Sequence, residues 1–210
     1  MVEVRRFQTE LARNVIAEDT FSSPIRNVAG LGIAYNGEDA AVACAMYDYG
    51  SLELLHSQLR GVRINFPYIP TLLSLREGPP MIELIRDAER KADLYLINGH
   101  GVAHPRRMGL ASYVGILTAM PTVGVAKSLL CGKVVENSSL QSPIIDSGEV
   151  VGSILRYAPH SAPLYISVGH GTSLRSSLEV VSKLITGHRL PEPLWMAKAL
   201  AEKTLFKEHA

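Results

Sequence analysis

Apolar and polar residues alternate along the chain in two periods, one typical of helices and one typical of strands. Apolar side chains recur at helical spacing over residues 2–18, which predicts a first helix. Three short runs of strand composition follow: 28–35, 40–47 and about 51–60. Because Asn36-Gly37 and Tyr49-Gly50 supply turns between these runs, the three strands are predicted to form an antiparallel meander.

A strand, a polar tip, a helix and a second strand come next. The two apolar runs, 94–97 and 122–125, have the length and composition of buried strands, and a helical pattern covers 108–120 between them. This order predicts a βαβ unit with parallel strands. The first strand ends at Asn98-Gly99-His100-Gly101, and the second leads into Lys127. Because ligands gather at the carboxyl ends of parallel strands, we expect the functional site here.

Glycine and proline divide the rest of the chain. A helix that begins at Thr71 is predicted to break at Gly78-Pro79-Pro80 and to resume at Met81, because proline removes a hydrogen-bond donor from a helix. Residues 138–150 are predicted to form a loop. Further strands are predicted at 150–157 and 164–168, and further helices at 173–186 and 191–207. Since no repeat or change in composition interrupts this pattern, a single α/β domain over residues 1–210 is expected.

The overall composition limits the class of protein. With 47% apolar and 20% charged residues, the 210-residue chain has the composition of a folded soluble protein. Its net charge is +1, so binding to nucleic acid would depend on a local basic patch. The two cysteines, Cys44 and Cys131, provide neither a metal-binding spacing nor a disulfide framework. Since no apolar run of the sequence is long enough to span a bilayer, we expect a cytoplasmic protein that does not bind membranes.

Several motifs of this sequence resemble those of one nuclease family. The signature of endonuclease V, a family that cuts near deoxyinosine in DNA or inosine in RNA, is similar to two stretches, NGHGVAHPRRMGLAS and PTVGVAKSLLCG. Further family blocks are matched by FPYIPTLLSLREGP at 66–79 and RLPEP at 189–193. The resemblance implies a ribonuclease H-like mixed sheet, an antiparallel meander followed by βαβ, flanked by helices. It also implies DNA or RNA as the partner, inosine-containing strands included.

The resemblance also exposes a departure at the metal site. The family's Mg²⁺ is held by clustered carboxylates and activates water for phosphodiester hydrolysis. At three of the family's metal-ligand positions this chain has Gly32, Asn98 and Lys198, and only Glu77 is retained. Glycine offers no ligand, asparagine offers a neutral oxygen, and lysine carries a positive charge that repels a cation. We therefore expect no bound metal, and nuclease activity that is lost or much reduced.

Two other interpretations stay open. An active endonuclease V would bind Mg²⁺ through altered ligands, for which Asp39 and Asp93 are the nearby candidates. Asp93 begins its strand at the end away from the tip, and Asp39 follows a turn, so neither position is favourable. A role in binding another protein is the third interpretation, in which the nucleic-acid surface is only residual.

By the same resemblance, part of the chain is expected to contact nucleic acid. Tyr68 lies on a loop stiffened by prolines and corresponds to the family's wedge, which enters a duplex beside a flipped base. The glycines and arginines of the signature are assigned to substrate binding: Gly99 and Gly101 at a flipped base, Arg106 and Arg107 at phosphates. Without the resemblance, the two arginines would be interpreted as solvated residues at the start of a helix.

Three residues are candidates for remnant catalytic chemistry: Glu77, His104 and Lys127. Glu77 is the remaining metal ligand of the family pattern, and Lys127 supplies positive charge for a phosphate. His104 is a candidate ligand or general acid, and a structural role is equally compatible with its position. Since an unpaired Glu77 in a cleft would be unfavourable, we expect the Lys198 ammonium within about 4 Å of its carboxylate, in place of the metal.

Overall fold

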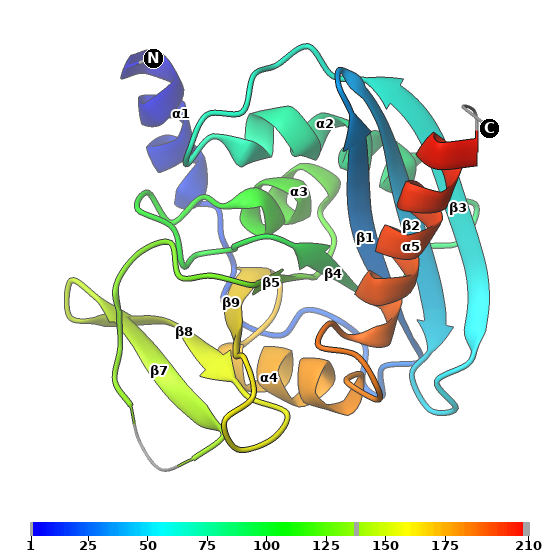
Figure 1. Cartoon of the computed structure of the whole chain (residues 1–210). Coiled ribbons are helices and arrows are strands. Elements are labelled where there is room, and N and C mark those ends of the chain that lie inside the picture. Colours follow the sequence, from blue (N-terminus) through cyan, green and yellow to red (C-terminus); the bar gives the residue numbers. More distant parts are fainter. Residues whose placement is uncertain (1, 137–138, 208–210) are drawn as a thin grey trace.

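A nine-stranded mixed sheet forms the centre of the described part of the molecule, with helices on both of its faces (Figure 1). The computed structural model describes residues 2–136 and 139–207. Its elements in chain order are α1 (Val2–Ala12), β1 (Asn27–Asn36), β2 (Asp39–Asp48), β3 (Leu54–Arg63), α2 (Leu73–Arg86), β4 (Leu94–Asn98), α3 (Leu110–Thr118), β5 (Thr122–Ala126), β6 (Lys133–Val134), β7 (Gln141–Asp146), β8 (Glu149–Leu155), β9 (Leu164–His170), α4 (Leu174–Lys183) and α5 (Glu192–Lys207). The strand order across the sheet is β3-β2-β1-β4-β5-β9-β8-β7-β6.

The strand pairing agrees with the pattern predicted from the sequence. β1, β2 and β3 pair antiparallel in succession, while β1, β4 and β5 are parallel neighbours. α3 connects β4 to β5, and β9 then pairs antiparallel with β5. The predicted mixed sheet, a meander followed by a βαβ unit, is therefore confirmed. This topology brings the carboxyl ends of β1, β4 and β5 to one edge of the sheet.

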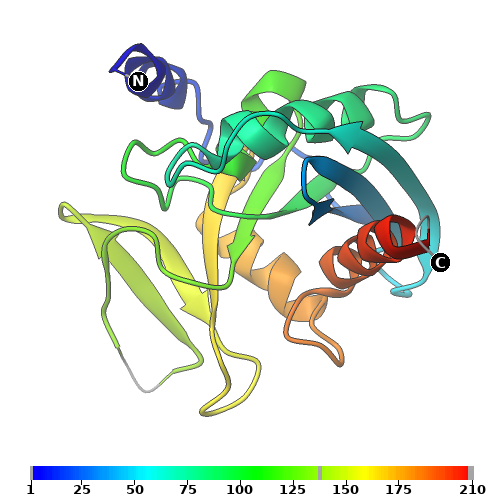
Figure 2. The same ribbon diagram turned by 45° about the horizontal axis from the view of Figure 1, so that its top comes forward.

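Two helical layers cover the sheet, α2 and α3 on one face and α4 and α5 on the other (Figure 2). Side chains alternate between these layers along each strand, so Leu31 packs with α2 and α3 while Val28 packs toward α4. Where α5 crosses β1, a Cβ on Gly30 would lie 2.3 Å from the carbonyl carbon of Pro193. Only glycine fits there, and α5 can therefore approach the sheet closely.

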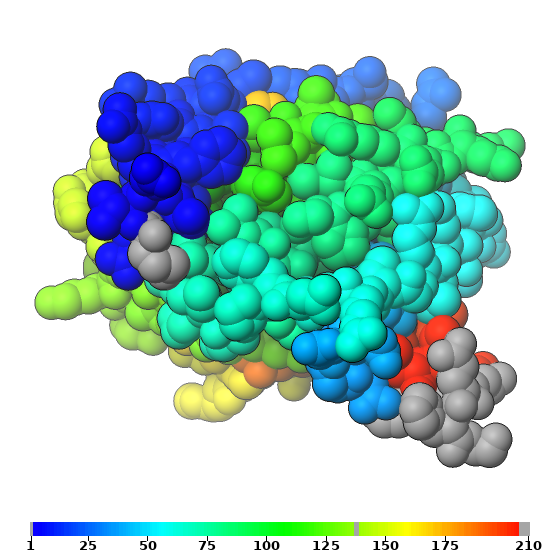
Figure 3. Space-filling model, turned by 90° about the horizontal axis from the view of Figure 1, so that it is seen from above, coloured from blue at the N-terminus to red at the C-terminus, as the bar shows by residue number. Residues whose placement is uncertain are grey.

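The first helix is shorter than predicted. α1 ends at Ala12, because the Ile16 N–H donates to His170 Nδ1 at 3.3 Å and its carbonyl accepts from the Gly171 N–H at 2.7 Å. These contacts direct the chain toward the end of β9. α1 itself, dark blue in Figure 3, lies against the surface formed by later segments, and Gln8 is fully buried in that contact.

The predicted break in the second helix is wrong, because α2 continues through Pro79 and Pro80 to Arg86. A Cβ on Gly78 would lie 2.6 Å from the ring of Tyr113 in α3, so the two helices are in close contact at this point. Packing between α2 and α3 thus stabilises the helix where the prolines remove backbone hydrogen bonds.

The predicted loop over 138–150 is also wrong for most of its length. Gln141–Asp146 forms β7, which pairs with β8, and residue 138 lies outside the described residues. Ser142 and Ile144 are buried on one face of this strand, and Pro143 between them disguises the alternation in the sequence. The two-residue strand β6 is not predicted from the sequence, and the other elements lie where they are predicted, with ends shifted by a few residues. None of the helices in the described part of the chain combines the length and apolar character needed to cross a bilayer.

Candidate functional site

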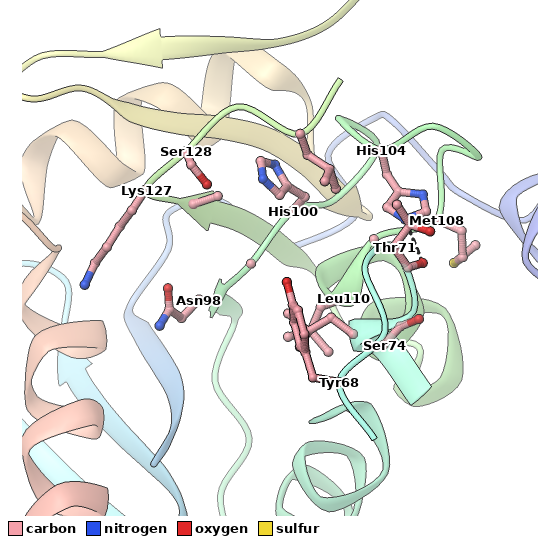
Figure 4. A pocket seen from close by; sticks show the side chains of 15 residues that line it. Tyr68, Thr71, Ser74, Asn98, His100, His104, Met108, Leu110, Lys127 and Ser128 are labelled. Atoms are coloured by element: carbon pink, nitrogen blue, oxygen red, sulfur yellow. Dashed lines mark hydrogen bonds between the residues drawn. The ribbon is translucent and has the colours of Figure 1, made fainter. Parts of the chain in front are cut away.

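A cavity of about 230 Å³ lies at the carboxyl ends of β4 and β5 (Figure 4). It is bounded by the loop that carries Tyr68, by Asn98-Gly99-His100 after β4, and by Lys127 and Ser128 after β5. Apolar side chains also line it: Leu73, Met108, Leu110, Ala126 and Leu130. Tyr68 is 68% exposed and stands across the cavity from His100. The structure thus brings Tyr68, Asn98 and Lys127 together at the predicted edge of the sheet.

The glycines of the polar tip shape the cavity, but their amides are already bound. A Cβ on Gly101 would lie 1.9 Å from the carbonyl oxygen of Val168, so only glycine fits against β9. The Gly99 N–H donates to the carbonyl of Val125 at 3.1 Å, and the Gly101 N–H donates to Ser167 Oγ at 2.9 Å. These partners disfavour a direct contact between the two amides and a flipped base, and the assignment of Gly99 and Gly101 to substrate binding stays a prediction.

A hydrogen-bond network centred on Thr71 fixes the loop that carries Tyr68. Thr71 has a φ of 69°, and its carbonyl accepts from Gln8 Nε2 at 3.1 Å and from His104 Nε2 at 3.0 Å. Arg106 Nη2 donates to the same carbonyl at 2.9 Å and to Thr71 Oγ1 at 2.6 Å. Arg106 Nε donates to Gln8 Oε1 at 2.8 Å. These donors of Arg106 are thus used within the chain, which disfavours the predicted phosphate contact.

His104 has the structural role that the sequence leaves open. It is 2% exposed, and its Nδ1 accepts the Arg106 N–H at 3.2 Å while Nε2 donates to Thr71. Burial lowers the pKa of His104 to about 4, the hydrogen bond to Thr71 opposes this, and the Arg106 charge adds to it. A neutral imidazole with both nitrogens occupied holds the loop in place and does not present a free group to a substrate.

His100 differs from His104 in having a nitrogen without a partner. Its ring lines the cavity, and burial lowers its pKa to about 4, so the imidazole is neutral. Of the residues that the structure describes, none forms a hydrogen bond with His100 Nδ1, although this atom is buried. His100 therefore keeps one buried nitrogen unsatisfied beside the cavity, and the pattern of its sequence neighbours does not distinguish it from His104.

Arg107 lies outside the cavity lining. Its guanidinium forms ion pairs with Asp146 at 2.7 Å and with Glu149 at 3.5 Å, on either side of the turn between β7 and β8. These carboxylates neutralise its charge. Arg107 therefore connects the central βαβ unit to the outer hairpin, and these ion pairs disfavour its predicted contact with phosphate.

Residues from three strands meet at the edge of the sheet beside the cavity. In the parallel register, Gly32 follows the pair Leu31–Ile97 and lies next to Asn98. Lys127 comes just beyond the β5 partner of Asn98. Because successive side chains alternate across a strand, these three positions share the face that α4 and α5 cover. The positions in β1 and β4 at which the family resemblance implies metal ligands thus adjoin Lys127 in this chain.

Lys198 lies on α5 directly over Gly32. A Cβ on Gly32 would lie 3.0 Å from the backbone nitrogen of Lys198, so even a short side chain there requires α5 to move by a few tenths of an ångström. The Lys198 ammonium forms an ion pair with Glu202 at 2.6 Å, one turn further along the helix. The predicted pairing of Lys198 with Glu77 is therefore wrong.

Glu77 is stabilised in a different way. It is 8% exposed, and the Tyr35 hydroxyl donates to its carboxylate at 3.0 Å. The Arg76 guanidinium lies 4.5 Å from the centre of the Tyr35 ring. Burial raises the pKa of Glu77 to about 7, although the Tyr35 hydrogen bond and the Arg76 charge oppose it. Near neutral pH, Glu77 is therefore protonated in a large fraction of the molecules. A protonated carboxyl group needs no lysine to neutralise it.

These residues do not fit a Mg²⁺ ion. Mg²⁺ prefers ionised carboxylates in a regular octahedral arrangement. Gly32 and Asn98 carry no charge, and Glu77 is buried with a raised pKa. Over residues 2–136 and 139–207, no group of three His, Cys, Asp or Glu side chains is arranged to hold a metal ion. The donor set that the family resemblance implies is therefore absent from the edge of the sheet.

The two alternative carboxylates, Asp39 and Asp93, do not replace this donor set. Asp93 Oδ2 accepts the N–H groups of Arg26 and Asn27 at 2.8 and 3.1 Å, at the opposite end of β4. Asp39 is exposed at the start of β2, opposite Asn36. Neither side chain lines the cavity.

The fold and the position of the cavity define the class of protein. A mixed sheet with an antiparallel meander, parallel β1, β4 and β5, and a pocket at their carboxyl ends is the architecture of a ribonuclease H-like protein. The crystal structure of an endonuclease V from Streptomyces avermitilis superimposes with a TM-score of 0.90 at 30% identity, covering 99% of this chain and 94% of that one.

Sequence comparison gives the family itself. The family model described as Endonuclease V matches residues 9–199. A protein from Roseiflexus sp. (strain RS-1) named Endonuclease V is 39% identical over 204 residues, which cover 96% of this chain and 91% of the relative. A Ciona intestinalis Endonuclease V, crystallised with a 24mer DNA containing an inosine followed by a ribo-adenosine, is 28% identical with a TM-score of 0.89, covering 99% and 98% of the two chains. The chain therefore belongs to the endonuclease V family.

Proposed function

We propose that this protein binds DNA or RNA and takes a single extrahelical base, inosine included, into the cavity without cutting the strand. The observation that carries the proposal is the cavity itself, which Tyr68, Asn98-Gly99-His100 and Lys127 enclose at the edge of the sheet. Enzymes that act on bases use a pocket of this kind to hold a nucleotide turned out of the stack.

The size and lining of the cavity support a base as the ligand. Its volume of about 230 Å³ is below the roughly 300–1,000 Å³ of sites for drug-sized molecules, so it suits one small ring system. Leu110 and Met108 give it apolar surface, and His100 and Lys127 add polar side chains to its lining. Tyr68, exposed on its loop, is placed to stack on a base or to fill the gap that a flipped base leaves.

The second part of the proposal, loss of cleavage, rests on the missing carboxylates. Phosphodiester hydrolysis by this family would require a metal-activated water, and Gly32, Asn98 and the buried Glu77 do not fit the metal. No cofactor is therefore proposed. The retained cavity and the missing ligands together support a protein that recognises nucleic acid and leaves it intact.

A single gel experiment tests both parts. Labelled DNA and RNA, with and without one inosine, are incubated with the protein in EDTA, Mg²⁺ or Mn²⁺, and both retardation and cutting are scored. We expect retardation in all three conditions, stronger with inosine, and no cutting. The Tyr68→Ala variant should lose the preference for inosine, while the exposed Tyr157→Ala variant serves as the matched control and should keep it.

Two outcomes would replace the proposal. Cutting that requires Mg²⁺ or Mn²⁺ and disappears in Glu77→Ala would establish an active endonuclease with altered ligands, provided that mass spectrometry shows no deamidation of Asn98. Absence of any salt-dependent retardation would favour a role in binding another protein.

A further inference from the structure

Positive charge gathers where the family resemblance expects carboxylates. Lys127 extends from the end of β5 past Asn98 toward α5 (Figure 4), and Lys198 lies on α5 over Gly32. Arg189, shortly before α5, donates from Nη2 to the Lys127 carbonyl at 3.0 Å. Cations from the segment after β5, from α5 and from the loop before α5 thus lie at the edge of the sheet beside the cavity.

Neighbouring acids do not balance these cations. Glu202 pairs with Lys198 at 2.6 Å, but the two side chains are 43% and 40% exposed. Within the described part of the chain, the Lys127 ammonium has neither an ion-pair nor a hydrogen-bond partner. Burial lowers the pKa of Lys127, the Lys198 and Arg189 charges lower it further, and Glu202 opposes them. Like charges that share one edge of a site repel each other, and a bound anion would relieve that repulsion.

The geometry of α5 connects this charge to the loss of the metal ligands. Over Gly32 the helix backbone occupies the space in which a longer side chain of β1 would begin, 3.0 Å from the ideal Cβ position. The same turn of α5 carries the Lys198 side chain to this edge. The position in β1 without a side chain and the lysine of α5 therefore lie at one close contact between helix and strand.

We propose that Lys127 and Lys198 bind a phosphate group without a metal ion, beside the cavity. The inference rests on the proposed function, since the phosphate belongs to the nucleic acid strand whose base enters the cavity. An exposed pair such as Lys198–Glu202 contributes little to stability, so the Lys198 ammonium exchanges Glu202 for a phosphate at small cost. Lys127 lines the cavity and extends toward α5, which carries Lys198 over Gly32, so a phosphate held between them would lie next to the bound base.

Fluorescence anisotropy with a short single-stranded oligonucleotide in EDTA tests this site. Lys198→Ala and Lys127→Ala should each weaken binding roughly tenfold at low salt, as expected for one charge-assisted hydrogen bond, and lower the slope of log K against log salt by about 0.7. Glu202→Gln releases Lys198 and should tighten binding severalfold. The matched controls are Lys203→Ala, an exposed lysine of α5, and Glu179→Gln, which breaks the exposed Arg175–Glu179 pair on α4.

Two results would overturn the inference. One is binding by Lys198→Ala that equals binding by Lys203→Ala. The other is wild-type binding that requires Mg²⁺ and is abolished by EDTA.

A second arm separates the site from the proposed function. Inorganic phosphate is titrated into the protein without nucleic acid, and the melting temperature is followed. Phosphate should raise the melting temperature of the wild type but not of Lys127→Ala or Lys198→Ala. If the oligonucleotide does not bind while this pattern holds, the proposed function fails and the phosphate site stands. If phosphate raises the melting temperatures of the wild type and of Lys203→Ala no more than those of Lys127→Ala and Lys198→Ala, the phosphate site fails.

Discussion

Replacing Arg106 with alanine distinguishes a residue that holds the cavity together from one that binds nucleic acid. The guanidinium donates to Gln8 Oε1 at 2.8 Å, to the Thr71 carbonyl at 2.9 Å and to Thr71 Oγ1 at 2.6 Å. Gln8 is fully buried, so the substitution leaves its Oε1 without this donor inside the protein. A buried acceptor left unsatisfied costs about 1–3 kcal/mol, and each further hydrogen bond contributes about 0.5–1.5 kcal/mol.

Arg106→Ala should therefore lower the free energy of unfolding by about 3 kcal/mol, once solvent access to the half-buried guanidinium is allowed for. For a chain of this size such a loss lowers the melting temperature by roughly 6–12 °C. The assay is thermal unfolding followed by circular dichroism, with the exposed Arg90→Ala variant as the matched control. At a temperature where both variants are folded, Arg106→Ala should keep the wild-type salt slope for nucleic acid.

The opposite pattern would refute the reasoning. A melting temperature equal to that of Arg90→Ala, together with a salt slope reduced by about 0.7, would show that Arg106 binds a phosphate and that the Thr71 network is dispensable.

Three other measurements test separate parts of the structure. Gly30→Ala should destabilise the protein by several kcal/mol, because its Cβ would lie 2.3 Å from Pro193, whereas Gly61→Ala, with nothing within 4 Å, should be nearly neutral. The folded state lowers the pKa of His104 from 6.5 to about 4, so as the pH falls the unfolded chain binds the proton before the folded chain does. The contribution of His104 to the free energy of unfolding is therefore complete above pH 6.5 and disappears toward pH 4. This contribution amounts to at most about 3 kcal/mol. The free energy of unfolding, measured with urea, should therefore depend less steeply on pH in His104→Gln than in the wild type. Adding Mg²⁺ should leave the melting temperature unchanged, since a metal bound only to the folded state would raise it.

The sequence by itself determined the elements of the fold and the edge of the sheet at which the cavity lies. Local periodicity separates strands from helices, and Asn36-Gly37 closes the hairpin between β1 and β2. The run from Asn98 to Gly101 follows a buried strand, so its place at the carboxyl edge follows from the βαβ order alone. The family motifs rest on consecutive residues and were therefore also visible in the sequence.

Only the tertiary structure decided what the charged residues do. Arg106 bonds to Gln8, which is 98 positions away in the chain, and Arg107 pairs with Asp146, 39 positions away. Contacts of this range depend on how the helices pack on the sheet, and no local pattern encodes them. The same holds for α2, where contact with α3 overrides the prolines. Lys198 meets Lys127 and not Glu77 because α4 and α5 cover one face of the sheet while α2, with Glu77, covers the other.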